Sequence, residues 1–435
     1  MKVLVIGVGY VGLVTAVCLA EIGHEVTCLD YDKRKIELLK SNKAPIYEKD
    51  LEKFMLKNKK RLKYTMNSEN VYQNIDAIFI CVGTPEREDG SANLKYIYDA
   101  VKELTENIKS DVVLVIKSTV PIGTNDEIEN YIKNNLKSDV NIEVVSNPEF
   151  LSQGTAIRDT LYAQRIVLGV SSKKAEIFMH KMYDKMKRKY VITDRKSAEM
   201  IKYASNVFLA LKISYINEIA NLSEIVGANI DDVSKGMGLD LRIGKQFLKA
   251  GIGYGGSCFP KDTKALYRLA SSNDYELKMV KSTIEVNESQ RKILIKKSKK
   301  YYESLLGVKV AILGVTFKAN TDDLRESPAI DSISLLLKEG ACVKVFDPVG
   351  NSKLQEIYKS KIKYCNSLEE VLMGAEIAFI FTEWNCIKNM NIKLFANLMK
   401  RAIVLDGRNC FELKKIPNGM IYESVGRKIV NKLVE

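Results

Sequence analysis

Short apolar segments alternate with longer amphipathic segments over the N-terminal part of the chain. Each apolar segment has the length of one strand, and they cover residues 2–7, 25–30, 77–83, 112–119, 142–148 and 165–170. Strands that alternate with helical patterns build βαβ units around a parallel sheet. The pattern therefore predicts an α/β domain over residues 1–196.

The pattern changes near Ser197, after which neither glycine nor proline occurs until Gly227. Apolar residues recur there at heptad spacing, at Ile201, Phe208, Tyr215 and Leu222, with Ala204 and Leu211 between them. This spacing predicts one continuous helix of about 30 residues, which would extend ~45 Å. Such a helix is too long for one compact domain, so we expect it to link two domains and to offer a surface for dimerisation.

Strand-like segments return in the C-terminal part of the chain, at residues 307–318, 341–348, 377–383 and 402–409. They predict a second α/β domain over residues 301–435, preceded by a helical dimerisation domain over residues 197–300. The expected fold class is α/β, with two Rossmann-like doubly wound domains joined by a long central helix.

The composition narrows the class of protein. With 435 residues the chain exceeds what one hydrophobic core usually supports, and its 28% charged residues are typical of a globular protein. No apolar run approaches the roughly 20 residues that a membrane span needs. The eight cysteines form no CxxC pair, and nothing clusters with the two histidines. We therefore expect a cytoplasmic protein without a bound metal.

The net charge of +13 favours anionic partners, either nucleic acid or small phosphorylated ligands. The basic residues are spread along the chain, however. Their densest clusters, at residues 57–63 and 296–303, are typical of exposed faces or helix ends. We expect neither nucleic acid nor a membrane as a partner.

A dinucleotide-binding pattern occupies the N-terminus. Gly7, Gly9 and Gly12 form G-x-G-x-x-G between the first apolar segment and a helical stretch, and Asp30 ends the next strand-like segment. The first glycine allows the tight turn, the second lets the backbone approach the pyrophosphate, and the third allows close packing of helix on sheet. The pattern predicts a bound dinucleotide.

The residues near Asp30 bear on which dinucleotide binds. Its carboxylate would accept hydrogen bonds from the ribose hydroxyls and repel a 2′-phosphate, which predicts NAD rather than NADP. The basic residues at positions 33–35 weaken this prediction, because they offer partners for a 2′-phosphate. The C-terminal domain keeps only Gly314 of such a pattern, which predicts a different ligand there, or none.

An unusual cysteine lies in the segment GIGYGGSCFPKD, residues 251–262. Pro260 is suited to the first turn of a helix, so Cys258 would lie just before a helix N-terminus, where the helix dipole and Lys261 stabilise a thiolate. The flanking glycines are expected to leave room for a ligand: Gly253, Gly255 and Gly256. On these residues alone, an unreactive cysteine in a glycine turn remains an alternative.

Eight motifs, in order along the chain, carry a family resemblance: GVGYVG, CVGTP, KSTVPIGT, NPEFLSQGTA, IKYASNVFLALKISYINEI, RIGKQFLKAGIGYGGSCFPKD, VTFKANTDDLRESPAI and DGRN. Over essentially its whole length the chain resembles the nucleotide-sugar 6-dehydrogenases of the UDP-glucose/GDP-mannose dehydrogenase family. The resemblance implies NAD-dependent, four-electron oxidation of UDP-glucose to UDP-glucuronate through a thiohemiacetal and a thioester on Cys258. The alternative is the same chemistry on another nucleotide sugar, such as GDP-mannose or a UDP-hexosamine.

The resemblance also implies catalytic roles. Lys202 would stabilise the developing alkoxide, and Asn206, one helical turn further on, would hold the substrate or a water. Asp262 would orient the hydrolytic water or Lys202, while Glu149 would act as a base or position the water. Without the resemblance, Lys202 and Asn206 would be interpreted as a solvated polar pair and Asp262 as a helix cap.

The binding residues that the resemblance implies fall into two sets. The expected NAD contacts are Gly7, Gly9, Tyr10, Val11, Gly12, Asp30, Lys35, Thr84, Thr119, Lys261 and Arg325, of which Thr119 also belongs to the catalytic set. The expected UDP-sugar contacts are Glu149, Phe150, Leu151, Gln153, Lys202, Asn206, Arg242, Phe247, Leu248, Lys249, Ala250, Gly251, Gly255, Lys318 and Arg408. The family lends the arginine at position 242 across a homodimer interface. Taken alone, each basic residue would be interpreted as surface.

One position departs from the family pattern. The family commonly has a second glutamate where this chain has Gln153. A neutral amide keeps the hydrogen bonds but cannot act as a base, so any such role would fall to Glu149. Two further hypotheses differ in class: a two-electron dehydrogenase in which Cys258 is incidental, and a non-catalytic protein that binds NAD or nucleic acid.

Overall fold

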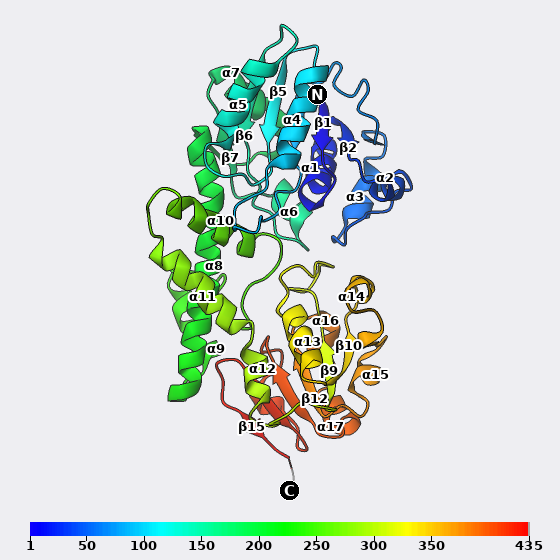
Figure 1. Ribbon diagram of the computed structural model, residues 1–435, viewed down its shortest axis with the longest axis vertical. Coiled ribbons are helices and arrows are strands. Elements are labelled where there is room, and N and C mark those ends of the chain that lie inside the picture. Colours follow the sequence, from blue (N-terminus) through cyan, green and yellow to red (C-terminus); the bar gives the residue numbers. More distant parts are fainter. Residues whose placement is uncertain (434–435) are drawn as a thin grey trace. The chain divides into compact units, whose positions relative to one another are not determined.

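Figure 1 shows the computed structural model, which describes residues 1–433. The chain forms two compact units, Met1–Ser205 and Asn206–Glu435. Residues 434 and 435, which the sequence assigns to the C-terminal domain, lie outside the described residues.

The first unit contains a sheet of eight strands in the order β3-β2-β1-β4-β5-β6-β7-β8. Its strands are β1 Lys2–Ile6, β2 Glu25–Leu29, β3 Leu62–Thr65, β4 Ala77–Ile80, β5 Val112–Ile116, β6 Ile142–Ser146, β7 Ile166–Gly169 and β8 Tyr190–Thr193. The first six follow the doubly wound order, with a switch point at β1 and β4. The prediction of a parallel sheet built from βαβ units is wrong at one place, because β6 and β7 pair antiparallel.

Helices cover both faces of this sheet, as the doubly wound prediction requires. On one face pack α1 Tyr10–Glu21, α2 Lys33–Lys40, α3 Leu51–Lys57, α6 Ala156–Leu161 and α7 Lys173–Tyr183. On the other face pack α4 Lys95–Asn107 and α5 Thr124–Asn135. Because β1, β4 and β5 are buried on both faces, they read as continuous apolar runs in the sequence.

The predicted long helix is confirmed as α8, Arg195–Val226, the long green helix of Figure 1. It has 32 residues and belongs to both units. Several of its heptad residues are exposed in the single chain: Phe208 by 61%, Tyr215 by 46% and Leu222 by 52%. The helix therefore carries an apolar face that the chain itself leaves uncovered.

The second unit continues with α9 Ile230–Leu239, α10 Phe259–Ser271, α11 Lys278–Gln290 and α12 Ile293–Ser298. Its sheet has the order β11-β10-β9-β12-β13-β14-β15, and only β15 is antiparallel to its neighbour. The strands are β9 Lys309–Leu313, β10 Cys342–Phe346, β11 Lys363–Tyr364, β12 Ile377–Ile380, β13 Ile403–Asp406, β14 Ile421–Ser424 and β15 Val430–Asn431. The helices that cover them are α13 Pro328–Lys338, α14 Asn351–Tyr358, α15 Leu368–Leu372, α16 Asn385–Lys388 and α17 Lys393–Leu398. Both α/β domains and the linking helix are thus as the sequence predicts.

Candidate functional site

The N-terminal glycine turn has the geometry that a pyrophosphate requires. Gly7 has a φ of +91°, which favours glycine, and α1 begins directly after Gly9. A Cβ at Gly12 would overlap the carbonyl oxygen of Gly7, whereas a Cβ at Gly9 would meet no atom within 4 Å. The turn is therefore closed on its protein side and open beside Gly9, in front of the N-terminus of α1, and these residues fit a dinucleotide.

Asp30 is held in place by the backbone on both sides. Its Oδ2 accepts from the amide of Val8 at 2.8 Å, and its Oδ1 accepts from the amide of Asp32 at 2.9 Å. Each oxygen keeps a lone pair for a ribose hydroxyl. Lys35 lies nearby with its Nζ 3.6 Å from an Asp32 carboxylate oxygen, which offsets its charge.

Two further expected NAD contacts meet where β4 and β5 end. The Oγ1 of Thr84 donates to the carbonyl oxygen of Thr119 at 2.9 Å. Tyr10, at the start of α1, donates its hydroxyl to the carbonyl oxygen of Tyr47 at 3.1 Å. The carboxyl ends of parallel strands at a switch point are where ligands of α/β sheets bind.

A buried ion pair lies at the end of β6. Lys202 on α8 donates its Nζ to Oε1 of Glu149 at 2.9 Å and to the backbone oxygen of Glu149 at 2.7 Å. The Oε2 of Glu149 accepts from the amide of Leu151 at 2.7 Å. The Phe150 ring centroid lies 5.5 Å from the Nζ of Lys202 and 4.2 Å from the guanidinium carbon of Arg165. The first unit thus presents a fixed carboxylate and a fixed ammonium together.

In the second unit, Cys258 is exposed at the N-cap of α10, which confirms that Pro260 lies in the first turn of a helix. Asp262 is almost completely buried. Its Oδ2 accepts from Nδ2 of Asn206 at 2.7 Å, and its Oδ1 accepts from Nζ of Lys261 at 2.6 Å. A free cysteine, an amide, a lysine and a carboxylate therefore gather at one helix start.

The prediction that the glycines around Cys258 leave room for a ligand is wrong. A Cβ at Gly255 would overlap the carbonyl oxygen of Glu326, and a Cβ at Gly256 would lie 2.8 Å from the Phe317 ring. Gly253 has a φ of +86° and abuts Asn287 in the same way. The space that these glycines leave is filled by the chain itself, so they serve to pack the loop that presents Cys258.

The expected substrate loop, residues 247–251, is anchored at its end. The amide of Gly251 donates to Oδ1 of Asn217 at 2.8 Å, and its carbonyl oxygen accepts from Nε2 of Gln290 at 2.6 Å. Leu248 and Ala250 are buried, whereas Phe247 has a φ of +63° and is partly exposed.

Arg408 follows β13 and is held by carbonyl groups. Its Nε donates to the oxygen of Phe381 at 2.7 Å, and its Nη2 donates to the oxygen of Phe317, the residue before Lys318, at 2.8 Å. Glu383 lies between two expected substrate contacts, 3.3 Å from Nε of Arg408 and 4.0 Å from Nζ of Lys249.

The two remaining arginines point to solvent. Arg242 forms a bidentate pair with Asp240, and its side chain is 89% exposed. Arg325 forms a similar pair with Asp323. These pairs with Asp240 and Asp323 do not hold either arginine against another expected site residue.

Family models match almost the whole chain. The NAD binding domain of the UDP-glucose/GDP-mannose dehydrogenase family matches residues 1–187, its central domain residues 196–289 and its UDP binding domain residues 311–413. The chain belongs to this family. It is an NAD-dependent nucleotide-sugar dehydrogenase, which confirms the prediction from its motifs.

Relatives of this dehydrogenase match it from end to end. It is 45% identical to the UDP-glucose 6-dehydrogenase YwqF of Bacillus subtilis, over 99% of this chain and 98% of that protein. It is 43% identical to the UDP-glucose 6-dehydrogenase of Rickettsia felis, over 99% of this chain and 97% of that protein. In the part of the dehydrogenase that the structure describes, no helix is both long and apolar enough to cross a bilayer.

Solved structures agree with this assignment. A UDP-glucose dehydrogenase from Pyrobaculum islandicum superposes with a TM-score of 0.92 at 34% identity, covering 98% of each chain. A UDP-D-ManNAc dehydrogenase from Pyrococcus horikoshii gives a TM-score of 0.87 at 27% identity, covering 98% of this chain and 99% of that one.

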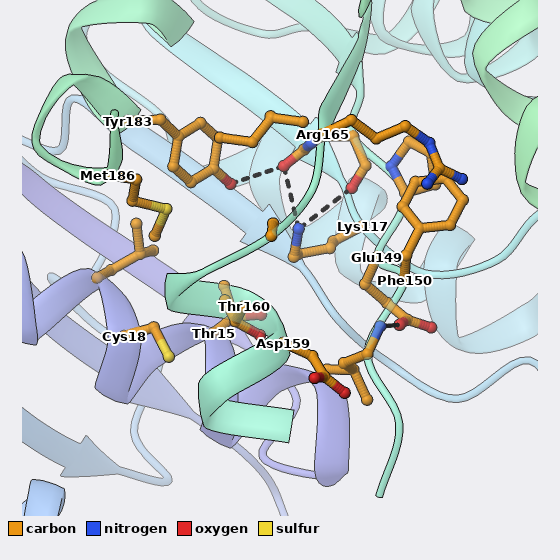
Figure 2. Close-up of a pocket in the computed structure, with 16 residues that line it drawn as sticks. Thr15, Cys18, Lys117, Glu149, Phe150, Asp159, Thr160, Arg165, Tyr183 and Met186 are labelled. Carbon is orange, nitrogen blue, oxygen red and sulfur yellow. Dashed lines mark hydrogen bonds between the residues drawn. The ribbon is translucent and has the colours of Figure 1, made fainter. Parts of the chain in front are cut away.

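Sequence reasoning missed a buried polar group in the first unit of the dehydrogenase. This group is the side chain of Lys117 with its partner Asn147, and Figure 2 shows Lys117 with the other residues that line a cavity. The cavity has a volume of about 50 Å³, and Thr15 and Glu149 also line it. Lys117 is buried at the end of β5, and burial lowers the pKa of its amino group. Lys117 and Asn147 are the first residues of two of the family motifs, KSTVPIGT and NPEFLSQGTA, but nothing in the sequence shows that they meet.

Proposed function

We propose that this dehydrogenase oxidises the hydroxymethyl group of UDP-glucose to the carboxylate of UDP-glucuronate. Two relatives named as UDP-glucose 6-dehydrogenases, 45% and 43% identical over nearly the whole chain, support the substrate. The observation that carries the chemistry is the exposed Cys258 at the start of α10, one helical turn before the buried Asp262.

The reaction converts UDP-glucose, two NAD⁺ and one water into UDP-glucuronate, two NADH and three protons. NAD⁺, when bound, accepts one hydride in each oxidation. The primary alcohol first loses a hydride and a proton and becomes an aldehyde, to which the sulfur of Cys258 adds. Loss of the second hydride and another proton turns this thiohemiacetal into a thioester. Water then adds to the thioester carbon, the C–S bond breaks, and the carboxylate, the thiol and the third proton are released.

Lys202 and Asn206 serve the oxidation steps in this proposal. The ammonium group of Lys202 is buried and fixed by Glu149, so it is prepared to stabilise an alkoxide without reorganising. Asn206 is fixed by Asp262, which supports its role in holding the sugar or a water.

Glu149 serves the hydrolysis step. Its carboxylate is fixed by Lys202 and by the amide of Leu151, which supports a role in orienting the attacking water. Gln153 cannot share a base role, since an amide does not take up a proton at neutral pH.

The cofactor and substrate contacts remain as the resemblance implies. For NAD they are the glycine turn, Tyr10, Val11, Asp30, Lys35, Thr84, Thr119, Lys261 and Arg325. For the UDP-sugar they include Phe150, Leu151, the loop of residues 247–251, Gly255, Lys318 and Arg408. The anchoring of Gly251 and Arg408 supports the second set, because a preorganised site loses less entropy on binding.

We also propose that the chain acts as a homodimer through α8. The exposed apolar side chains of Phe208, Tyr215 and Leu222 support this, because large exposed apolar patches mark interaction sites. Arg242 would then reach the partner's substrate.

The division into domains 1–196, 197–300 and 301–435 is supported by the matched family ranges. The eight cysteines, none of them in a disulfide, support a cytoplasmic location.

The test is NADH production from a panel of UDP- and GDP-sugars. UDP-glucose is expected to give the highest kcat/KM, with two NADH per acid. The alternative, another nucleotide sugar, is supported by the likeness to the P. horikoshii UDP-D-ManNAc dehydrogenase. A higher kcat/KM for GDP-mannose or a UDP-hexosamine would replace UDP-glucose, and turnover of none of the sugars would overturn the proposal.

A further inference from the structure

Lys117 is a buried lysine that the proposed chemistry does not use. Its Nζ donates to Oδ1 of Asn147 at 3.1 Å and to the backbone oxygen of Asn147 at 3.4 Å. Within residues 1–433 it forms no ion pair. A buried ammonium without a carboxylate partner lowers stability, so it is expected to persist for another reason.

Asn147 is the point where this network meets the backbone. Its Oδ1 also accepts from the hydroxyl of Tyr183 at 2.6 Å, a hydrogen bond that Figure 2 draws as a dashed line from Tyr183. Its Nδ2 donates to the oxygen of Val167 at 2.9 Å. Its own amide donates to the oxygen of Ile116 on β5 at 3.0 Å. Side chain and backbone of Asn147 are therefore fixed from three other segments.

Glu149 follows Asn147 after one residue, Pro148, whose ring fixes φ. The turn is thus held at two points, by Lys117 through Asn147 and by Lys202 at Glu149 itself. Removing Lys117 loosens the first point without abolishing it, because Asn147 keeps its hydrogen bonds to Tyr183, Val167 and Ile116.

The cavity beside Lys117 is lined by further polar groups. Thr15 directs a buried Oγ1 toward it that has no hydrogen-bond partner among the described residues. With a volume of about 50 Å³ and polar walls, the cavity is large enough for a few water molecules. Water there would complete the hydrogen bonds of Thr15 and of the third N–H of Lys117.

We infer that Lys117 is a positioning residue for thioester hydrolysis, because it fixes through Asn147 the turn that carries Glu149. The inference rests on the proposed function of Glu149. The attack of water depends directly on the direction of the Glu149 carboxylate. The two hydride transfers depend on Glu149 only through Lys202, whose backbone is held separately by α8. Loss of Lys117 is therefore expected to slow hydrolysis more than oxidation.

The test is Lys117→Met, which keeps the length of the side chain and removes its donors. We expect kcat to fall about 10- to 100-fold, since a misplaced group costs rates of this order. KM for UDP-glucose should fall as well, because slow hydrolysis lets the adduct accumulate, so that kcat/KM changes much less than kcat. The second expected result is a rapid burst of two NADH per active site, followed by slow turnover. Mass spectrometry of the quenched enzyme should then show the acyl adduct on Cys258.

A matched control is Lys297→Met, since Lys297 is equally buried but pairs with Glu224 and Glu423 in the second unit. It should lower the melting temperature and the folded fraction without an accumulating adduct. Tyr183→Phe removes the other donor to Asn147 and should give a smaller accumulation of adduct, so the test stands even if Lys117→Met does not fold.

Equal loss of all steps, or no adduct in either the Lys117 or the Tyr183 variant, would overturn the inference. If wild-type enzyme itself gives one NADH per product, the proposed function fails instead.

Discussion

Asp30 and Asp347 occupy the same place in the two sheets, at the end of the second strand of each, and both accept from an amide of the preceding β–α turn. Asp347 is buried, and the amides of Val315 and Gly350 and the indole N–H of Trp384 occupy its carboxylate. Asp30 meets only backbone amides. This difference agrees with a dinucleotide in the first sheet and with the missing glycines of the second.

At Asp30 we predict a strong preference for NAD over NADP, by about 100-fold or more in kcat/KM, because a 2′-phosphate would face a carboxylate. Asp30→Asn should narrow this ratio by at least tenfold. The control is Asp99→Asn, at an exposed position of α4, which should leave the ratio unchanged. Comparable kcat/KM for the two cofactors in wild-type enzyme would contradict the prediction.

Glu423 predicts a pH dependence of stability. Burial raises the pKa of its carboxyl, but Lys297, Lys300 and the hydroxyl of Tyr301 outweigh that effect, and the net pKa is lowered. Glu423 therefore contributes fully to the free energy of unfolding when the pH is above the ordinary pKa of a glutamate. This contribution is lost as the pH falls through the lowered pKa of the folded protein. The difference in urea midpoint between wild type and Glu423→Gln should shrink from pH 7 to pH 4. A constant difference would rule out this origin.

At the level of elements, the loop before α10 shows why glycine motifs mislead. The sequence shows that glycines cluster there, but it does not show which atoms occupy the space that a side chain would otherwise fill. We predict that Gly255→Ala destabilises the protein by about 2 kcal/mol, since its Cβ would overlap the oxygen of Glu326.

The matched control is Gly236→Ala, inside α9 with no atom within 4 Å of the added Cβ. It should stabilise by about 0.5–1 kcal/mol, because alanine is the better helix former. Chemical denaturation measures both. A neutral Gly255→Ala would show that the loop adapts freely.

Elements with strong periodicity were predictable, and weakly patterned ones were not. The fully buried β4 and the long α8 have clear apolar signatures. The edge strands β3 and β8 were missed because they are short and half exposed. The strand β7 was predicted but its antiparallel pairing with β6 was not, because strand direction depends on the path of the connection, which periodicity does not contain.

The candidate site divides in the same way. Cys258, Asp262 and the glycine turn lie in compact motifs, so their positions at a helix start and at a strand–helix turn could be predicted from local sequence. Lys117, Asn147 and Tyr183 lie in three distant segments of the chain. Nothing in the sequence shows that their side chains form one buried hydrogen-bonded group.

At the level of the whole molecule, the exposed heptad face of α8 predicts a dimer. Leu222→Glu should convert dimers into monomers and lower kcat by at least about tenfold, because Arg242 would no longer reach a partner's substrate. Sedimentation velocity and kcat at the same concentration measure both effects. Leu56→Glu, at an exposed position of α3, is the control and should change neither. A fully active monomer would contradict the dimer.

The covalent role of Cys258 is tested most directly by measuring NADH and UDP-glucuronate together, for wild type and Cys258→Ala. Wild-type enzyme should release two NADH per UDP-glucuronate with little free aldehyde. Cys258→Ala should still bind NAD and UDP-glucose but lose acid production by orders of magnitude, as removal of a covalent nucleophile does. A Cys258→Ala enzyme that keeps even about a tenth of wild-type acid production would contradict the thioester mechanism and leave Cys258 an incidental residue.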